Sequence, residues 1–92
     1  MVKDKRYATV KKLISNGLLT SLTEIFDTIP KSVIARDLGM NNMRFTKMMK
    51  NVELFVLKDI YRLAFFLEVD EWLLLKMVHQ QHVDNKENKK KK

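Results

Sequence analysis

The spacing of apolar residues along the chain predicts helices from one end to the other. Tyr7, Val10, Leu13 and Ile14 fall at i, i+3, i+6 and i+7, which is one face of a helix. The Asn-Gly pair at positions 16–17 predicts its end, because glycine takes a left-handed backbone without a steric penalty. No alternating run bounded by hairpin residues indicates a strand.

Two further helices are predicted on either side of Pro30. Ser21, followed three residues later by Glu24, is a capping-box signature for the first of them. Pro30 cannot continue that helix and suits the first turn of the next, which Gly39 ends. Their apolar positions are Leu22, Ile25, Phe26 and Ile29 in the first helix, and Val33, Ile34 and Leu38 in the second.

Three helices are expected in the second half of the chain. Asn41 or Asn42 can cap a helix that ends near residue 50, with Met43, Phe45, Met48 and Met49 as its apolar positions. A loop over residues 51–55 leads to a helix over residues 57–68, for which no good N-cap is visible. Asp70 caps a last helix over residues 71–82. The prediction is an all-α compact bundle of five or six short helices, with an extra N-terminal helix, in one domain over residues 1–83.

Composition narrows the class of protein. A chain of 92 residues forms one small domain, and an apolar content of 46% is enough to bury a core. The absence of cysteine excludes a disulfide framework and a Cys-based zinc site. No apolar run is long enough for a membrane span, and no signal-peptide stretch follows the charged N-terminus. These features fit a cytoplasmic protein.

The net charge of +7 is concentrated at the two ends of the chain. Residues 1–12 carry five cations and one acid, residues 84–92 carry five lysines and two acids, and the remainder holds eight of each sign. Basic ends on a neutral body favour contact with a polyanion. We expect residues 84–92 to be a disordered lysine-rich tail, and the simplest interpretation of its charge is a segment that improves solubility.

The stretch KSVIARDLGMNNMRFTKMMK, residues 31–50, resembles the helix-turn-helix of the lambda-repressor-like, Cro/repressor-type (XRE-like) DNA-binding domains. That family has a small residue in the first helix, an apolar residue and glycine at the turn, and buried apolar residues in the second helix. The matching residues are Ala35, Leu38, Gly39, Met40, Phe45 and Met48. The stretch VLKDIYRLAFFLEVDEWLLL resembles the family's fourth helix and the start of its fifth, with Leu57, Ile60, Leu63, Ala64, Leu67 and Val69 on apolar positions, so the resemblance covers about residues 21–78. It departs from the family at positions 31–32, where Lys-Ser replaces the usual phosphate-binding glutamine.

The helix beginning near Asn42 has an outer face that can enter a major groove. Arg and Lys can donate to guanine, Asn can bond to adenine, and a methionine or threonine methyl can touch the thymine methyl. We expect base contacts from Asn41, Asn42, Met43, Arg44 and Lys47, and phosphate contacts from Lys31, Ser32, Thr46 and Lys50. The predicted function is a sequence-specific transcriptional repressor of bacterial or phage type that binds double-stranded DNA and associates with the nucleoid.

The last two helices carry more apolar surface than one core needs. A large exposed apolar patch usually marks an interface. We expect a two-fold homodimer that presents two recognition helices to half-sites about one DNA turn apart. Alternatively, residues 7–14 cover this surface within one chain. The interface residues would be Phe65, Trp72, Leu73, Leu74, Met77 and Val78.

Other functions fit the residues less well. A protein–protein adaptor, such as an antitoxin whose last helix and tail hold a toxin, is the main alternative, and nonspecific nucleoid packaging is a third. His79 and His82, with Asp84 nearby, are too few for a transition-metal site, which usually needs three or four donors. No Ser/His/Asp set and no Gly-rich phosphate loop is visible. We therefore expect neither an enzyme nor a bound cofactor or metal.

Overall fold

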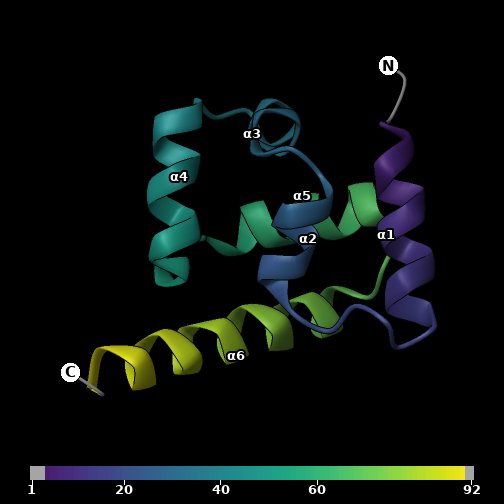
Figure 1. Cartoon of the computed structure of the whole chain (residues 1–92). Helices are drawn as coiled ribbons and strands as arrows, with labels where there is room; N and C mark the ends of the chain where they lie inside the picture. The colour runs from purple at the N-terminus through teal and green to yellow at the C-terminus, as the bar shows by residue number, and fades with distance from the viewer. Residues whose placement is uncertain (1–3, 91–92) are drawn as a thin grey trace.

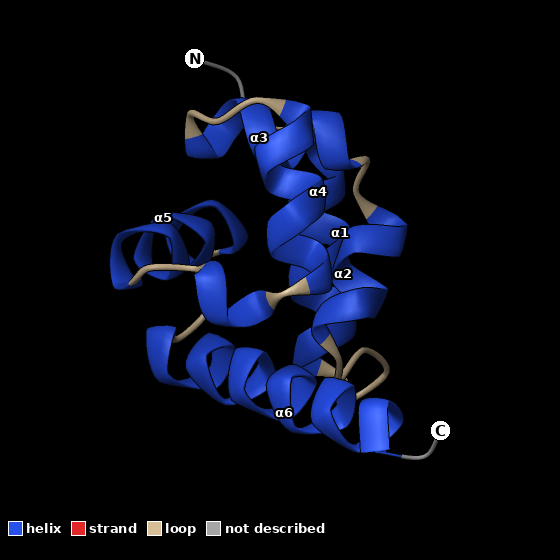
Figure 2. Cartoon of the chain, turned by 90° about the vertical axis from the view of Figure 1, so that its left-hand side faces the viewer, coloured by secondary structure: helices blue, strands red, loops and turns tan. Residues whose placement is uncertain are grey.

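Helices make up most of the described chain. The computed structural model describes the backbone of residues 4–90 and the side chains of residues 4–87. It contains no strand within that range (Figures 1 and 2). This confirms the all-α prediction. The elements in chain order are α1 (Lys5–Ser15), α2 (Leu22–Thr28), α3 (Lys31–Leu38), α4 (Asn42–Lys50), a short 3-10 helix η1 (Val52–Leu54), α5 (Leu57–Leu67) and α6 (Glu71–Lys90).

The helices are arranged with α1 and α4 on opposite sides of the molecule (Figure 1). Helices α2, α3 and α5 lie between them, and α6 runs beneath. Helix α5 packs against α1, α3 and α6, while α6 also packs against α2 and η1. The core is shared by all of these elements, since each of them contributes buried apolar side chains.

The core confirms most of the apolar positions that the spacing predicted. Phe26 and Phe45 pack edge to face with ring centroids 5.3 Å apart, and Tyr7 stacks on Phe66 at 5.4 Å. Ala35 is fully buried in α3, where its small side chain takes up little space between the packed helices. The largest fully buried side chains are those of Tyr7, Val10, Leu22, Ile25, Ile29, Ile34, Phe45, Met48, Val52, Leu67 and Leu74.

The turn between α3 and α4 sets the position of α4. Gly39 is left-handed, with φ of 75° and ψ of 32°. Its N–H donates to the Arg36 carbonyl at 3.1 Å, and the Met40 N–H donates to the Ala35 carbonyl at 2.9 Å. This pair of bonds is the Schellman motif that ends many helices. Asn41 then caps α4, so only residues 39–41 separate the two helices.

Replacing Gly39 by alanine should lower the free energy of unfolding by about 1 kcal/mol, because an L residue is strained in the left-handed region. The added Cβ would lie 3.4 Å from Arg62 Nη1, an ordinary contact, so backbone strain accounts for the effect. Gly17→Ala is the matched control: its φ is 72°, no atom lies within 4 Å of the new Cβ, and the loss should be similar. Urea unfolding measures both variants. An unchanged midpoint for Gly39→Ala would contradict the left-handed turn.

Helix α6 extends further than the sequence predicted. We expected it to end near residue 82 and a disordered tail to begin at residue 84, but α6 continues through Lys90, and residues 91–92 lie outside the described chain. Two side-chain pairs at i, i+4 spacing support the extension. Gln80 Nε2 donates to Asp84 Oδ1 at 3.0 Å, and Gln81 Nε2 donates to Asn85 Oδ1 at 3.1 Å. The structure therefore does not confirm a disordered tail over residues 84–92.

The segment between α4 and α5 also differs from the prediction. The loop expected over residues 51–55 contains η1, whose Val52 is buried in the core. Val56 offers no side-chain cap to α5, as predicted, but the Asp59 carboxylate accepts a hydrogen bond from the Val56 N–H at 3.4 Å. No helix of the described residues has the length and apolar content needed to cross a membrane.

Candidate nucleic-acid interface

The outer face of α4 is open to solvent. Met43 is 81% exposed, although the sequence placed it among the apolar positions of this helix. Phe45 and Met48 lie buried on the opposite face, and Met49 is half-buried. In Figure 1, α4 forms the edge of the molecule opposite α1. The exposed residues at its start and along its face are Asn41, Asn42, Met43, Arg44, Lys47 and Lys50.

The side chains of Asn41 and Thr46, two of the predicted contact residues, hydrogen-bond to the backbone of α4. Asn41 Oδ1 accepts a hydrogen bond from the Arg44 N–H at 2.8 Å, so this side chain caps α4. Bidentate bonding to adenine needs both the amide oxygen and the amide nitrogen, and the cap already uses one of the two lone pairs of the Asn41 oxygen and fixes its direction. Thr46 Oγ1 donates to the Asn42 carbonyl at 2.8 Å. Both residues are therefore weaker candidates for DNA contact than the sequence indicated.

Three of the predicted phosphate contacts come together on one side of α4. Lys31 Nζ donates to Thr46 Oγ1 at 3.3 Å, which joins the start of α3 to the middle of α4. Lys31, Thr46 and Lys50 also line a hollow of about 230 Å³, together with Asp27 on α2. Ser32 is exposed beside Lys31 at the start of α3. The cationic groups of two helices thus lie along the same edge.

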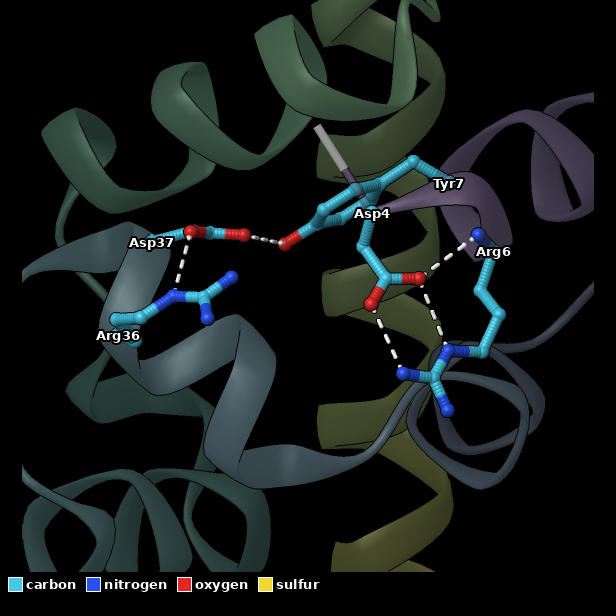
Figure 3. A network of polar contacts seen from close by, with 5 residues as sticks. All are labelled: Asp4, Arg6, Tyr7, Arg36 and Asp37. Atoms are coloured by element: carbon cyan, nitrogen blue, oxygen red, sulfur yellow. Dashed lines mark hydrogen bonds and ion pairs between the residues drawn. The ribbon is translucent and has the colours of Figure 1, made fainter. Parts of the chain in front are cut away.

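Asp37 is the last acid in the sequence before α4, and its side chain points into the protein. Asp37 Oδ2 accepts from the Tyr7 hydroxyl at 2.7 Å, and Asp37 Oδ1 accepts from Arg36 Nε at 3.2 Å (Figure 3). The Asp37 side chain is only 6% exposed. No other acid occurs before Glu53, so every charge in the sequence between residues 38 and 52 is positive. These positive charges are the ones on α4.

Two polar side chains at the start of α1 have shifted pKa values. Burial, followed by the hydrogen bond to Asp37, raises the pKa of Tyr7 well above its ordinary value. At the start of α1, Asp4 accepts a hydrogen bond from the Arg6 N–H, and both of its oxygens accept from the Arg6 guanidinium (Figure 3). These bonds to Arg6 hold the pKa of Asp4 well below its usual range. Helix α1 is thus tied to α3 through Tyr7.

The apolar surface expected for a partner is only partly available. Leu74 and Met77, predicted as dimer contacts, are buried in the chain's own core and are not exposed to a partner. The reason is that α6 packs against α5, α2 and η1 at once and needs a wider apolar face than a helix with one neighbour. Trp72 remains 65% exposed, Leu73 is also exposed, and Val78 is half-buried.

Helix α1 covers part of the excess apolar surface of α5. Tyr7 stacks on Phe66, which becomes buried, whereas the neighbouring Phe65 is 72% exposed. Tyr61, Phe65 and Glu71 line a depression of about 670 Å³ where α5 ends and α6 begins. Covering by residues 7–14 thus accounts for Phe66 but not for the exposed aromatic side chains near this depression.

The histidines of α6 are not part of a metal site in the structure. Within the described residues, no group of three or more His, Asp or Glu side chains could hold a metal ion. His82 Nδ1 instead lies 3.5 Å from Glu53 Oε2, which links α6 to η1.

The sequence did not predict two polar contacts that position α3. Arg62 Nη1 donates to the Leu38 carbonyl at 3.3 Å and so satisfies one of the last carbonyls of α3. The other is the hydrogen bond from Tyr7 to Asp37. The partners are 24 and 30 residues apart, and no periodicity connects them. One feature of the sequence could have indicated the bond between Tyr7 and Asp37. Asp37 follows the apolar Ile34 by three residues, which places both side chains on the same side of the helix.

Comparison of the chain with protein-family models, with curated proteins and with solved structures finds no match. The chain's own residues must therefore support any functional assignment.

Proposed function

We propose that this protein binds duplex DNA sequence-specifically and represses transcription by occupying its site. In this proposal α3 and α4 are a helix-turn-helix, and α4 lies in the major groove. The observation that carries it is the outer face of α4, where Asn42, Met43, Arg44 and Lys47 are exposed on one short helix without a neighbouring acid in the sequence. These side chains have the donors, the acceptor and the methyl group that distinguish base pairs in that groove.

The residues around this face suit contacts to the DNA backbone. Lys31 and Ser32 lie at the start of α3, and Lys50 lies at the end of α4. Contacts of this kind hold a protein in register on the duplex without reading its sequence. The resemblance of residues 21–78 to the lambda-repressor-like domains supports the same function, since Gly39 is left-handed and Ala35 is buried at the positions where the family pattern needs them.

Selection of bound sequences from a random duplex pool, at near-physiological salt, tests the proposal. We expect an enriched motif, and an affinity that falls linearly with salt on logarithmic axes as phosphate contacts release counterions. A pool without enrichment would contradict sequence-specific binding. Attraction that depends on salt but not on sequence would then be a property of the net charge alone.

We further propose that two copies associate through the exposed apolar surface of α5 and α6. Trp72 is 65% exposed in the first turn of α6, and the depression lined by Tyr61 and Phe65 ends at the adjacent Glu71. Large aromatic side chains of this kind are typical anchors of protein interfaces. Phe65, Trp72 and Leu73 would make the contact, with Val78 at its edge.

Trp72→Glu should convert the dimer into a monomer, because the interface would have to bury an unpaired carboxylate. Sedimentation at micromolar concentrations measures the change. Thr9→Glu on α1 introduces the same charge at another exposed site and should leave the dimer intact. A wild-type protein that is monomeric at every concentration would contradict the proposed association.

The same exposed aromatic side chains favour one second function, which is an adaptor that binds another protein, as an antitoxin does. Tyr61, Phe65 and Trp72 would then contact a different chain rather than a second copy. This alternative predicts a tight complex with a protein and an attraction to DNA that is blind to sequence. The pool selection separates the two functions, since an adaptor enriches no motif.

A further inference from the structure

The C-terminal ends of α4 and α6 meet at one junction. Asn85 Nδ2 on α6 donates to the carbonyl of Lys50, the last residue of α4, at 3.5 Å. His82 Nδ1 lies 3.5 Å from Glu53 Oε2 in the neighbouring η1. Figure 1 shows the end of α6 on the same side of the molecule as α4. Asn85 and Lys86 of α6 are therefore placed beside the end of the proposed reading helix, a position that the sequence did not indicate.

The junction contains a recess of about 180 Å³ that is lined by two lysines, a histidine, two asparagines and only one acid. That acid, Glu53, already faces His82. The Nδ2 groups of the two asparagines already donate to the carbonyls of Lys47 and Lys50. The two lysines therefore give the recess an excess of positive charge, which suits an oxyanion. The lining residues are Lys50, Asn51, Glu53, His82, Asn85 and Lys86.

The other described acids at this end of α6 do not line the recess. Asp84 accepts a hydrogen bond from Gln80, and Glu87 is exposed on the last turns of the helix. Lys86 thus lines the recess together with Lys50 and contributes its charge from a second helix. If Lys50 contacts a phosphate, as the proposed function expects, Lys86 lines the same recess and is the next cation beside it.

We infer that this recess binds a phosphate of the DNA backbone, so that α6 is a second DNA-contacting element beside α4. This inference rests on the proposed DNA binding and extends it to Lys86, Asn85 and His82. The simpler explanation is that Lys86 only offsets the partial negative charge at the end of α6. That explanation predicts an effect on helix stability and none on the salt dependence of DNA binding.

The experiment compares Lys86→Gln with Lys12→Gln in the full chain, by fluorescence anisotropy on the selected duplex over a range of salt concentrations. Lys12 is an exposed lysine in the last turn of α1, so it controls for the helix-end effect. Helix α1 lies on the opposite side of the molecule from α4 (Figure 1). Lys86→Gln should reduce the slope of log K against log salt by about 0.9 and weaken specific and unrelated duplexes by the same factor. Lys12→Gln should leave the slope unchanged, and Lys86→Arg should restore the wild-type slope.

An unchanged slope in Lys86→Gln, with sequence-specific binding by the wild type intact, would overturn the phosphate recess and leave the proposed function standing. Equal losses in Lys86→Gln and Lys12→Gln would also overturn it, because net charge would then explain both. A wild-type protein that enriches no duplex sequence would remove the proposed function, and the recess as a DNA site with it.

Discussion

Replacing Asn42, Arg44 and Lys47 together by alanine should remove the preference for a selected duplex and leave the fold intact. A base contact by such a side chain contributes about 1–3 kcal/mol of discrimination, so losing three should weaken specific binding about 100-fold or more. All three side chains are exposed, and the free energy of unfolding should therefore change by about 0.5 kcal/mol or less for each substitution. Competition between selected and unrelated duplexes measures the preference.

The matched control is the triple alanine variant of Thr9, Lys11 and Lys12 on α1. These residues are exposed, and their replacement removes one polar group and two cations, as the change on α4 does. This variant should keep the preference. If the α4 variant still prefers the selected duplex, other residues read the bases.

Lys50→Ala should weaken binding to all duplexes alike, because the phosphate contact proposed for Lys50 carries no sequence information.

Tyr7→Phe should lower the free energy of unfolding by about 1.5–3 kcal/mol, the range for a hydrogen bond to a charged group. The lost hydroxyl donates to Asp37 at 2.7 Å, and Tyr7 is only 1% exposed, so water has little access to replace it. Tyr61→Phe removes the same atom from an exposed tyrosine on α5 and should change stability by about 0.5 kcal/mol or less. Urea unfolding at neutral pH measures both. Equal effects of the two variants would contradict the buried contact between α1 and α3.

The raised pKa of Tyr7 also predicts how stability responds to alkaline pH. Folding holds this tyrosine in its neutral form, so the stabilisation is complete below the ordinary pKa of 10.0 and is lost as pH rises through the higher pKa of the folded state. Between about pH 10 and 12, the free energy of unfolding should fall more steeply in the wild type than in Tyr7→Phe. Unfolding curves recorded at several pH values check this. Parallel pH profiles for the two proteins would show that the Tyr7 hydroxyl does not titrate differently on folding.

The sequence by itself determined most of the helices and the faces they bury. The caps at Ser21 and Asn41 and the left-handed turn at Gly39 depend on residues only a few positions apart along the chain. The burial of Tyr7 and Phe45 follows from helical periodicity in the same way. Short-range geometry of this kind is visible in a sequence because backbone hydrogen bonds and side-chain spacing in a helix span about four residues.

Only the tertiary structure decided which surfaces remained available for a partner. Periodicity could not show that Leu74 would be covered while Trp72 stayed exposed, because that depends on how many helices pack against α6. Nor could it show that Asp37 bonds to Tyr7, or that Asn85 brings the basic end of α6 to the carbonyl of Lys50. The physical reason is that each of these outcomes depends on contacts between residues far apart in the chain, and folding alone brings them together.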